Sequence, residues 1–333
     1  MTKKTRYFLF GAVAFIVAGL SIGLVAYYGG LPGIAFSNTA GPDELRYVPK
    51  TAVVVAYANV HDIMTSQFRQ RFKEYEGQAG AGEGQREVRD SLGIDIENDI
   101  DYVVACMLPG PGSPDKSGLV VAKGRFDQSR IETFIKDHDG VAEAYKGRTI
   151  YTHPKENHGE LMGVAFIQND VVAMGSVAAI KSALDVESAG TSVVASTEVM
   201  DMVRKVEDGN VWAVGRFDAL AGHARLPEQV ASQIPAITWF SASGQVNGGV
   251  TGHLSVEARD DEAAKNLRDV VGGFMAFGRL QAGSKPEIQS LLNSIQLGGE
   301  AKTVTLSFTV PSEVFDALKS MADSKMKKGA DEK

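Results

Sequence analysis

An uncharged, apolar run near the N-terminus constrains this chain more than any other feature of its sequence. The run extends from Tyr7 to Tyr28, and no charged residue occurs between Arg6 and Asp43. A helix satisfies its own backbone hydrogen bonds and needs about 20 apolar residues to cross a bilayer. We therefore predict that residues 7–28 form a transmembrane signal anchor.

The charges that flank this run predict its orientation. The charged residues of segment 1–6 are all basic, whereas the first charged residues after the run are Asp43 and Glu44. Because positively charged flanks stay in the cytoplasm, we expect residues 1–6 there. We predict a single-pass protein of the cell membrane, with residues 29–44 as a linker and the main domain outside the cytoplasm, in the periplasm.

A cleaved signal peptide is the competing interpretation of the same run. Its apolar core is usually about 7–15 residues long and ends at a small-x-small site. The core here is longer, and the sequence Leu24-Val25-Ala26 is a poor cleavage site because leucine stands where a small residue is required. We favour an uncleaved anchor, and cleavage stays open as the alternative.

The rest of the chain is acidic. Residues 43–333 contain all 41 acidic residues of the chain, whereas three of its 34 lysines and arginines lie before residue 43. Segment 43–333 is therefore more negative than the whole chain, whose net charge is −7. Nucleic acids and anionic lipids attract basic surfaces, so we predict no nucleic-acid partner. The one cysteine of the chain, Cys106, lies in a strand-like apolar run and is expected to be buried.

A repeated octapeptide is the most informative feature of the main domain. Residues 120–127 and residues 211–218 agree at six of eight positions, and residues 55–62 form a looser third copy. In each copy we expect a strand that leads into a helix, with a glycine at the strand end and an aspartate that caps the helix. We prefer this architectural role to a catalytic one for the repeated residues, which are Gly124, Arg125, Phe126, Asp127, Gly215, Arg216, Phe217 and Asp218.

The pattern of strands and helices predicts an α+β fold. Residues 303–310 alternate apolar and hydroxyl side chains, as expected for a strand with one buried face. Together with the repeat, such segments predict an N-terminal transmembrane helix followed by two related halves, residues 45–190 and 191–324. We expect each half to be an antiparallel sheet with helices packed on one face. Residues 325–333 are expected to form a disordered tail.

One predicted helix is unusually apolar at its C-terminal end. Its apolar residues recur at helical spacing, so they are expected to share one side of the helix. We expect this side to line either an exposed apolar patch or an apolar cavity. The candidate apolar binding face consists of Leu267, Val270, Val271, Phe274 and Phe277.

Sequence motifs of known chemistry do not match this chain. The six histidines lack zinc-protease spacing. The acidic run 92–101 fits an EF-hand poorly, because Ile100 and Cys106 stand where glycine and glutamate are required. We interpret it as a turn with local capping by Asp95. We predict no catalytic, cofactor-binding or metal-binding residues, and a triad assembled from residues distant in sequence stays open.

Several segments of the first half resemble those of a group of proteins without known activity. The chain resembles uncharacterised single-pass membrane-anchored extracytoplasmic α+β proteins of acidobacterial type. The resemblance implies no activity, so it assigns no site residue. The segments that carry it are Leu45 to Tyr57, Gly93 to Val104, Gly124 to Asp127, Tyr145-Lys146-Gly147, and Val171 to Ser176 followed by Lys181.

These observations favour a non-catalytic function. We expect a membrane-anchored extracytoplasmic protein that binds or scaffolds a protein partner in the envelope, for example as an accessory subunit of a membrane complex. The first alternative is a carrier of lipid or another small apolar ligand. The second is a hydrolase whose active site matches no motif. The sequence leaves the oligomeric state and the identity of the partner open.

Overall fold

The computed structural model describes most of the main domain. The described residues are 43–70, 83–109, 117–152, 161–206, 208–217, 237–281, 289 and 292–311. The predicted anchor at 7–28 and the predicted tail at 325–333 lie outside them. Within the described ranges, no helix has both the length and the apolarity needed to cross a bilayer.

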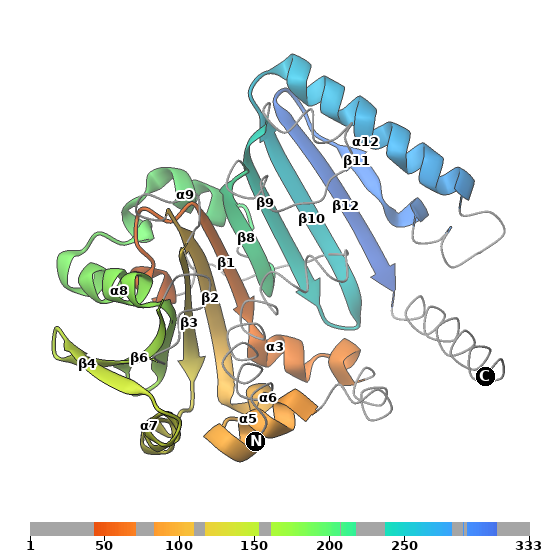
Figure 1. Cartoon of the computed structure of the whole chain (residues 1–333). Helices are drawn as coiled ribbons and strands as arrows, with labels where there is room; N and C mark the ends of the chain where they lie inside the picture. Colours follow the sequence, from red (N-terminus) through yellow and green to blue (C-terminus); the bar gives the residue numbers. More distant parts are fainter. Residues whose placement is uncertain are drawn as a thin grey trace, which may run out of the picture.

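The described strands form one antiparallel sheet of twelve strands (Figure 1), in the order β11-β12-β10-β9-β8-β1-β2-β3-β7-β6-β5-β4. Short turns join β4 to β5, β6 to β7, β9 to β10 and β11 to β12, and such turns place sequential strands antiparallel. The strands are β1 (Val54–Asn59), β2 (Ile100–Leu108), β3 (Ser117–Gly124), β4 (Val141–Tyr145), β5 (Arg148–Thr152), β6 (Met162–Gln168), β7 (Val171–Ser176), β8 (Val211–Arg216), β9 (Ile237–Val246), β10 (Gly249–Ala258), β11 (Gln296–Gly298) and β12 (Thr303–Pro311).

The two predicted halves share this sheet. The two halves meet at the pair β8 and β1 in the middle of the sheet. From this pair outward, the strands follow the order β1-β2-β3-β7 in the first half and β8-β9-β10-β12 in the second. The halves join where β1 pairs with β8, with Ala56 opposite Ala213. The prediction of an antiparallel α+β fold is confirmed, but the expected two separate sheets are in fact one continuous sheet.

The first half has helices on both faces of the sheet. Alternate residues of β1 and β2 belong to different apolar clusters, with Val55 and Val104 in one and Ala58 and Val103 in the other. A sheet that is apolar on both sides needs cover on both sides, so the predicted single helical face is wrong for this half. One face carries η2 (Asp43–Tyr47), α8 (Val177–Ala189), η3 (Val193–Ala195) and α9 (Thr197–Val203), and the other carries α3 (Val60–Thr65), α5 (Glu83–Leu92), α6 (Ile96–Asp99) and α7 (Gln128–Asp137).

The second half fits the prediction of one helical face. Val256 of β10 and Val304 of β12 are buried in a cluster with the first part of α12 (Asp261–Gln281). The alternate residues of the same strands are polar, such as His253 and its cross-strand neighbour Ser307. In the described part of this half, α12 covers the apolar face of the sheet, and α12 lies beside β11 and β12 in Figure 1.

Several local predictions are confirmed and others are corrected. Asp95 caps α6, since its carboxylate accepts a hydrogen bond from the Glu97 amide at 3.1 Å. Helix α3 ends at Thr65, and Ser66 is its C-cap. Strand β4 is not among the strands that the sequence predicts, and its residues Val141 to Ala144 are exposed.

Candidate functional site

The first part of α12 is buried, and its end is exposed. Ala263, Leu267, Val270, Phe274 and Phe277 are spaced four, three, four and three residues apart, so they form one row along the helix. The exposed fraction of the side chains rises along this row from 5% at Leu267 to 42% at Phe274 and 59% at Phe277. The helix therefore carries one apolar stripe past the end of the core.

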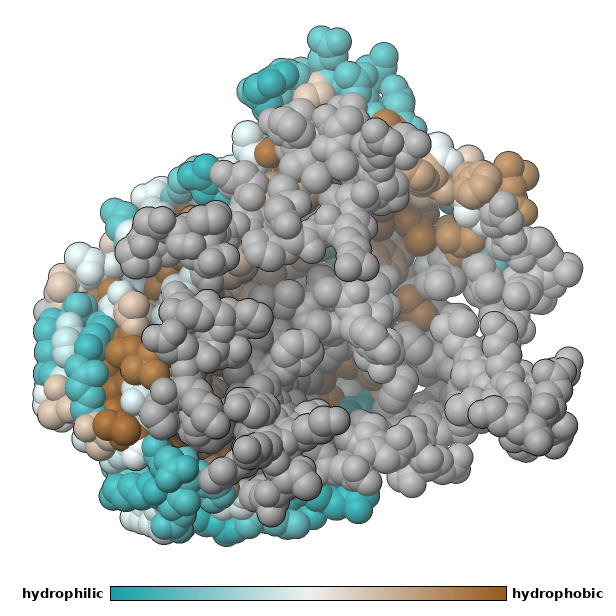
Figure 2. Space-filling view, viewed as in Figure 1, coloured by the Kyte–Doolittle hydropathy of each residue, from teal (hydrophilic) through white to brown (hydrophobic). Residues whose placement is uncertain are grey.

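Leu280 extends this exposed apolar end onto the neighbouring row and is 81% exposed. We call Phe274, Phe277 and Leu280 the α12 patch. Hydrophobic surface is visible over the far end of α12 (Figure 2). Soluble surfaces tolerate single exposed apolar side chains, whereas three together on one helix are a recognised sign of an interaction surface.

Few charged side chains lie close to the α12 patch in the described part of the helix. Glu262 and Asp269 share a helical row with Leu280, but they precede it by roughly 27 and 16 Å along the helix. Arg279 directly precedes Leu280, and its guanidinium donates a hydrogen bond to the Leu292 carbonyl at 3.5 Å.

The structure divides the predicted apolar face into two parts. Leu267 is buried and Val271 packs against the same core cluster, so these two residues hold the helix on the sheet. Val270 is half-buried, and Phe274 and Phe277 are exposed. The prediction missed Leu280, although its position three residues after Phe277 was a usable signal.

The repeated Gly-Arg pair has the same structural role in β3 and β8. A Cβ atom on Gly124 would lie 2.0 Å from the Asp99 carbonyl oxygen, and one on Gly215 would lie 2.6 Å from the Val53 carbonyl oxygen. The following amides donate hydrogen bonds to these same carbonyls, Arg125 to Asp99 at 2.7 Å and Arg216 to Val53 at 2.8 Å. In both copies, the Gly-Arg pair therefore lets the end of the strand pack closely against the backbone just before the neighbouring strand and bond to it.

The remaining repeat residues that the structure describes are also structural. Asp127 caps α7 by accepting a hydrogen bond from the Arg130 amide at 3.0 Å. Phe126 packs in the same apolar cluster as Ile131, as the sequence predicts. Phe217 stacks edge-on against Phe240, and Asp218 lies outside the described residues.

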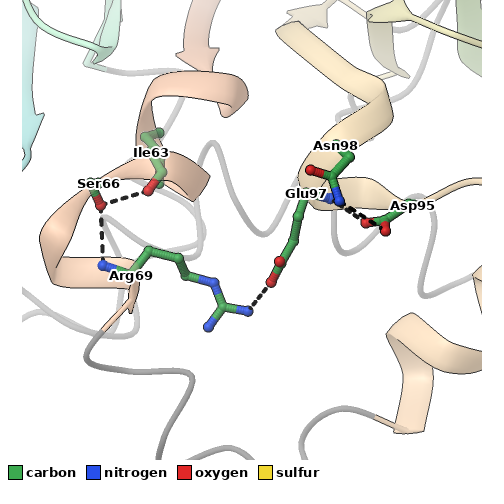
Figure 3. A network of polar contacts seen from close by, with 6 residues as sticks. All are labelled: Ile63, Ser66, Arg69, Asp95, Glu97 and Asn98. Atoms are coloured by element: carbon green, nitrogen blue, oxygen red, sulfur yellow. Dashed lines mark hydrogen bonds and ion pairs between the residues drawn. The ribbon is translucent and has the colours of Figure 1, made fainter.

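A partly buried ion pair ties the segment after α3 to α6 (Figure 3). The Arg69 guanidinium lies 2.7 Å from the Glu97 carboxylate, and the two side chains are 10% and 17% exposed. Ser66 fixes the start of this segment, because its hydroxyl donates to the Ile63 carbonyl and accepts from the Arg69 amide. These contacts bridge two elements of the fold.

Tyr145, Lys146 and Lys181, three of the residues that carry the resemblance, lie close together at the β4–β5 end of the sheet. Lys146 and Gly147 adopt left-handed backbone conformations with φ of 47° and 76°, which make a tight turn between β4 and β5. The Tyr145 hydroxyl donates to Asp185 of α8 at 2.9 Å, and the Lys146 ammonium lies 2.6 Å from the same carboxylate. The Lys181 ammonium lies 5.2 Å from the centre of the Tyr145 ring.

The described part of the chain shows neither a metal-ligand cluster nor a reactive thiol. There, no three His, Cys, Asp or Glu residues are placed to hold a metal ion. Burial raises the pKa of the Cys106 thiol to about 12, so this thiol is not a reactive nucleophile. The two hollows beside α7 are open to solvent, and neither is lined by a histidine.

The fold and the α12 patch define an α+β protein with one long sheet and an exposed apolar helix end. The model of a family described as "Protein of unknown function (DUF3352)" matches residues 9–248, and the chain belongs to this family. No curated protein matches the chain. A solved structure described as "Structure of crystal form I of TP0453" is similar, with 11% identity, a TM-score of 0.45, and coverage of 85% of this chain and 98% of that chain.

Proposed function

We propose that this protein is a membrane-anchored extracytoplasmic protein that binds another protein of the cell envelope through the α12 patch, as a scaffold or accessory subunit. The exposure of Phe274, Phe277 and Leu280 on one helix end carries the proposal. Large aromatic side chains commonly supply much of the binding energy at protein interfaces. Burial of these three side chains by a partner removes apolar surface from water, which favours association.

The charge of the chain argues for a protein partner instead of a bilayer. The chain as a whole has a net charge of −7. Anionic lipids repel such a surface, whereas a protein with an apolar centre and a basic rim complements it. The predicted anchor at 7–28 would keep the domain near membrane complexes of the envelope.

Co-purification from native membranes tests this proposal. The full-length chain is cross-linked in membranes, purified in mild detergent and compared with a variant that carries Phe277→Ser and Leu280→Ser. The control is Val194→Ser, because Val194 is 50% exposed and lies on η3, away from α12. We expect one envelope protein to accompany the wild-type and control chains, and at least tenfold less of it to accompany the α12 variant.

Three results would contradict the proposal. A partner that the α12 variant retains would place the interface elsewhere. A cross-link to lipid alone would identify the bilayer as the occupant of the patch, and a cross-link to a second copy alone would identify self-association. None of these results depends on a loss of folding, because both substituted side chains are exposed.

A further inference from the structure

A polar hollow of about 240 Å³ lies at the end of the sheet where β5, β6 and α7 meet. Its wall includes Arg148 and Thr149 of β5, Gln168 and Asn169 at the β6–β7 turn, and Gln128 at the start of α7. All of these residues belong to the described part of the chain. The hollow is separate from the α12 patch, which lies at the other end of the sheet (Figure 1).

Two local irregularities of the backbone bring these side chains together. The tight turn at Lys146 and Gly147 starts β5 with Arg148 at the mouth of the hollow. A register shift in the β6–β7 pairing lies between Phe166 and Gln168. Such bulges change the direction of a side chain and often occur beside binding sites. Gln168 is thereby directed to the same hollow as Arg148.

Three polar side chains of this wall are available to a ligand. Among the described residues, the side chains of Arg148, Gln168 and Asn169 form neither a hydrogen bond nor an ion pair with another residue. Gln128 is engaged instead, because its amide donates to the Glu132 carboxylate at 2.7 Å. The wall of the hollow therefore includes a guanidinium and two amides that are available to a ligand.

The charges of the wall point to an anionic ligand. Arg148 is the one charged residue among those that line the hollow, although the chain has a net charge of −7. A guanidinium binds a carboxylate through two parallel hydrogen bonds, and neighbouring amides can hold further oxygens. We propose that this hollow binds a small organic carboxylate, with Arg148 on the carboxylate and Gln168 and Asn169 on its other polar groups.

Calorimetric titration of the full-length chain in mild detergent tests this site. The probes are D-glucuronate as a sugar acid, N-acetyl-D-alanine as a peptide-like carboxylate, D-glucose as a neutral analogue, and inorganic phosphate. We expect saturable binding of at least one carboxylate, and the preferred probe identifies its source. Loss of a charge-assisted hydrogen bond costs about 1.5–3 kcal/mol, so Arg148→Gln should weaken binding roughly 10–100-fold.

The control variant is Arg204→Gln, which removes an exposed arginine of α9 that pairs with Asp201. It should bind the carboxylate as the wild type does, and both variants should keep the wild-type unfolding temperature. The proposal is overturned if neither carboxylate gives a saturable signal, if glucose or phosphate binds more tightly, or if Arg148→Gln binds unchanged. These outcomes do not bear on the α12 patch, because the titration contains no protein partner.

Discussion

Gly124 and Gly215 fix the positions of two strand ends by the absence of a side chain. Each lies against the carbonyl group that the next residue's amide uses as its hydrogen-bond acceptor. A methyl group at either position would push the strand away from this carbonyl and strain the hydrogen bond. The sequence identity of the two copies thus reflects the same backbone contact.

Gly124→Ala is expected to destabilise the protein by about 1–3 kcal/mol, the usual cost of overpacking. Gly118→Ala is the matched control, because Gly118 lies on the same strand and a Cβ there would have no atom within 4 Å. Urea unfolding of both variants measures the difference. Equal stability of the two variants would contradict the structural role of the repeat.

The contact between the β4–β5 hairpin and α8 depends on pH, because it is made through the Asp185 carboxylate. Hydrogen bonds from Lys146 and Tyr145 lower the pKa of the Asp185 carboxyl below its usual 3.8. A depressed pKa in the folded state means that this contact stabilises the fold above the usual pKa and is lost as the pH falls through the lowered value. The contact is therefore intact at neutral pH.

Asp185→Ala should accelerate hydrogen exchange in β4 and β5 at neutral pH and remove the acid-dependent loss of their protection. Asp201→Ala, which removes a more exposed aspartate of α9, serves as the control. Protection factors measured from neutral pH to below pH 4 test this. Unchanged protection of β4 in Asp185→Ala would show that the hairpin is held by its strand pairing alone.

Within the element α12, burial changes along a row of similar side chains. Leu267→Ala should cost about 2–5 kcal/mol, because it leaves a cavity in the core. Phe277→Ala should change the free energy of unfolding by less than about 0.5 kcal/mol, because the ring is 59% exposed. Chemical denaturation of both variants tests this division, and a large loss in Phe277→Ala would place that ring in a core contact.

Elements with a strong internal pattern could be predicted from the sequence, and the others could not. The alternation of β12 identifies a strand because one of its faces is buried and the other is polar. β4 has no such pattern, since Val141 through Ala144 are all exposed and its conformation depends on pairing with β5. Local sequence carries little information about a strand that tertiary pairing creates.

The sequence predicted which apolar residues lie along α12, but it did not predict which of their side chains are exposed. Leu267 and Phe277 occupy equivalent positions of one helical row, so the sequence assigns them the same face. Their different burial depends on where the sheet and its neighbours end beneath the helix, which is a tertiary property. The hollow near Arg148 gave no sequence signal, because its wall combines three separate segments.

At the scale of the whole molecule, the central strands bind the two halves into one unit. β1 pairs with β8, and the Phe68 amide donates to the Asn247 carbonyl of the β9–β10 turn at 2.7 Å. The Asn59 amide at the end of β1 also donates a hydrogen bond to the Asn210 carbonyl of the second half, at 2.7 Å. The two halves are therefore joined by direct pairing of a strand from each, β1 and β8.

The domain should therefore unfold in a single cooperative transition. A fragment of residues 43–206 would expose the edge of β1, which is buried between strands in the full sheet. We expect this fragment to aggregate or to remain unfolded, because an unpaired apolar edge strand promotes association. Circular dichroism and calorimetry measure both properties, and an independently folded fragment would contradict the single-unit architecture.

The central claim is that the α12 patch is the surface through which this protein meets a partner. The most direct measurement is site-specific photo-cross-linking in native membranes, with a photoreactive amino acid at position 277 and a control at position 194. We predict one envelope protein cross-linked from position 277 and not from position 194. Equal products from both positions, or a product from position 194 alone, would contradict the claim.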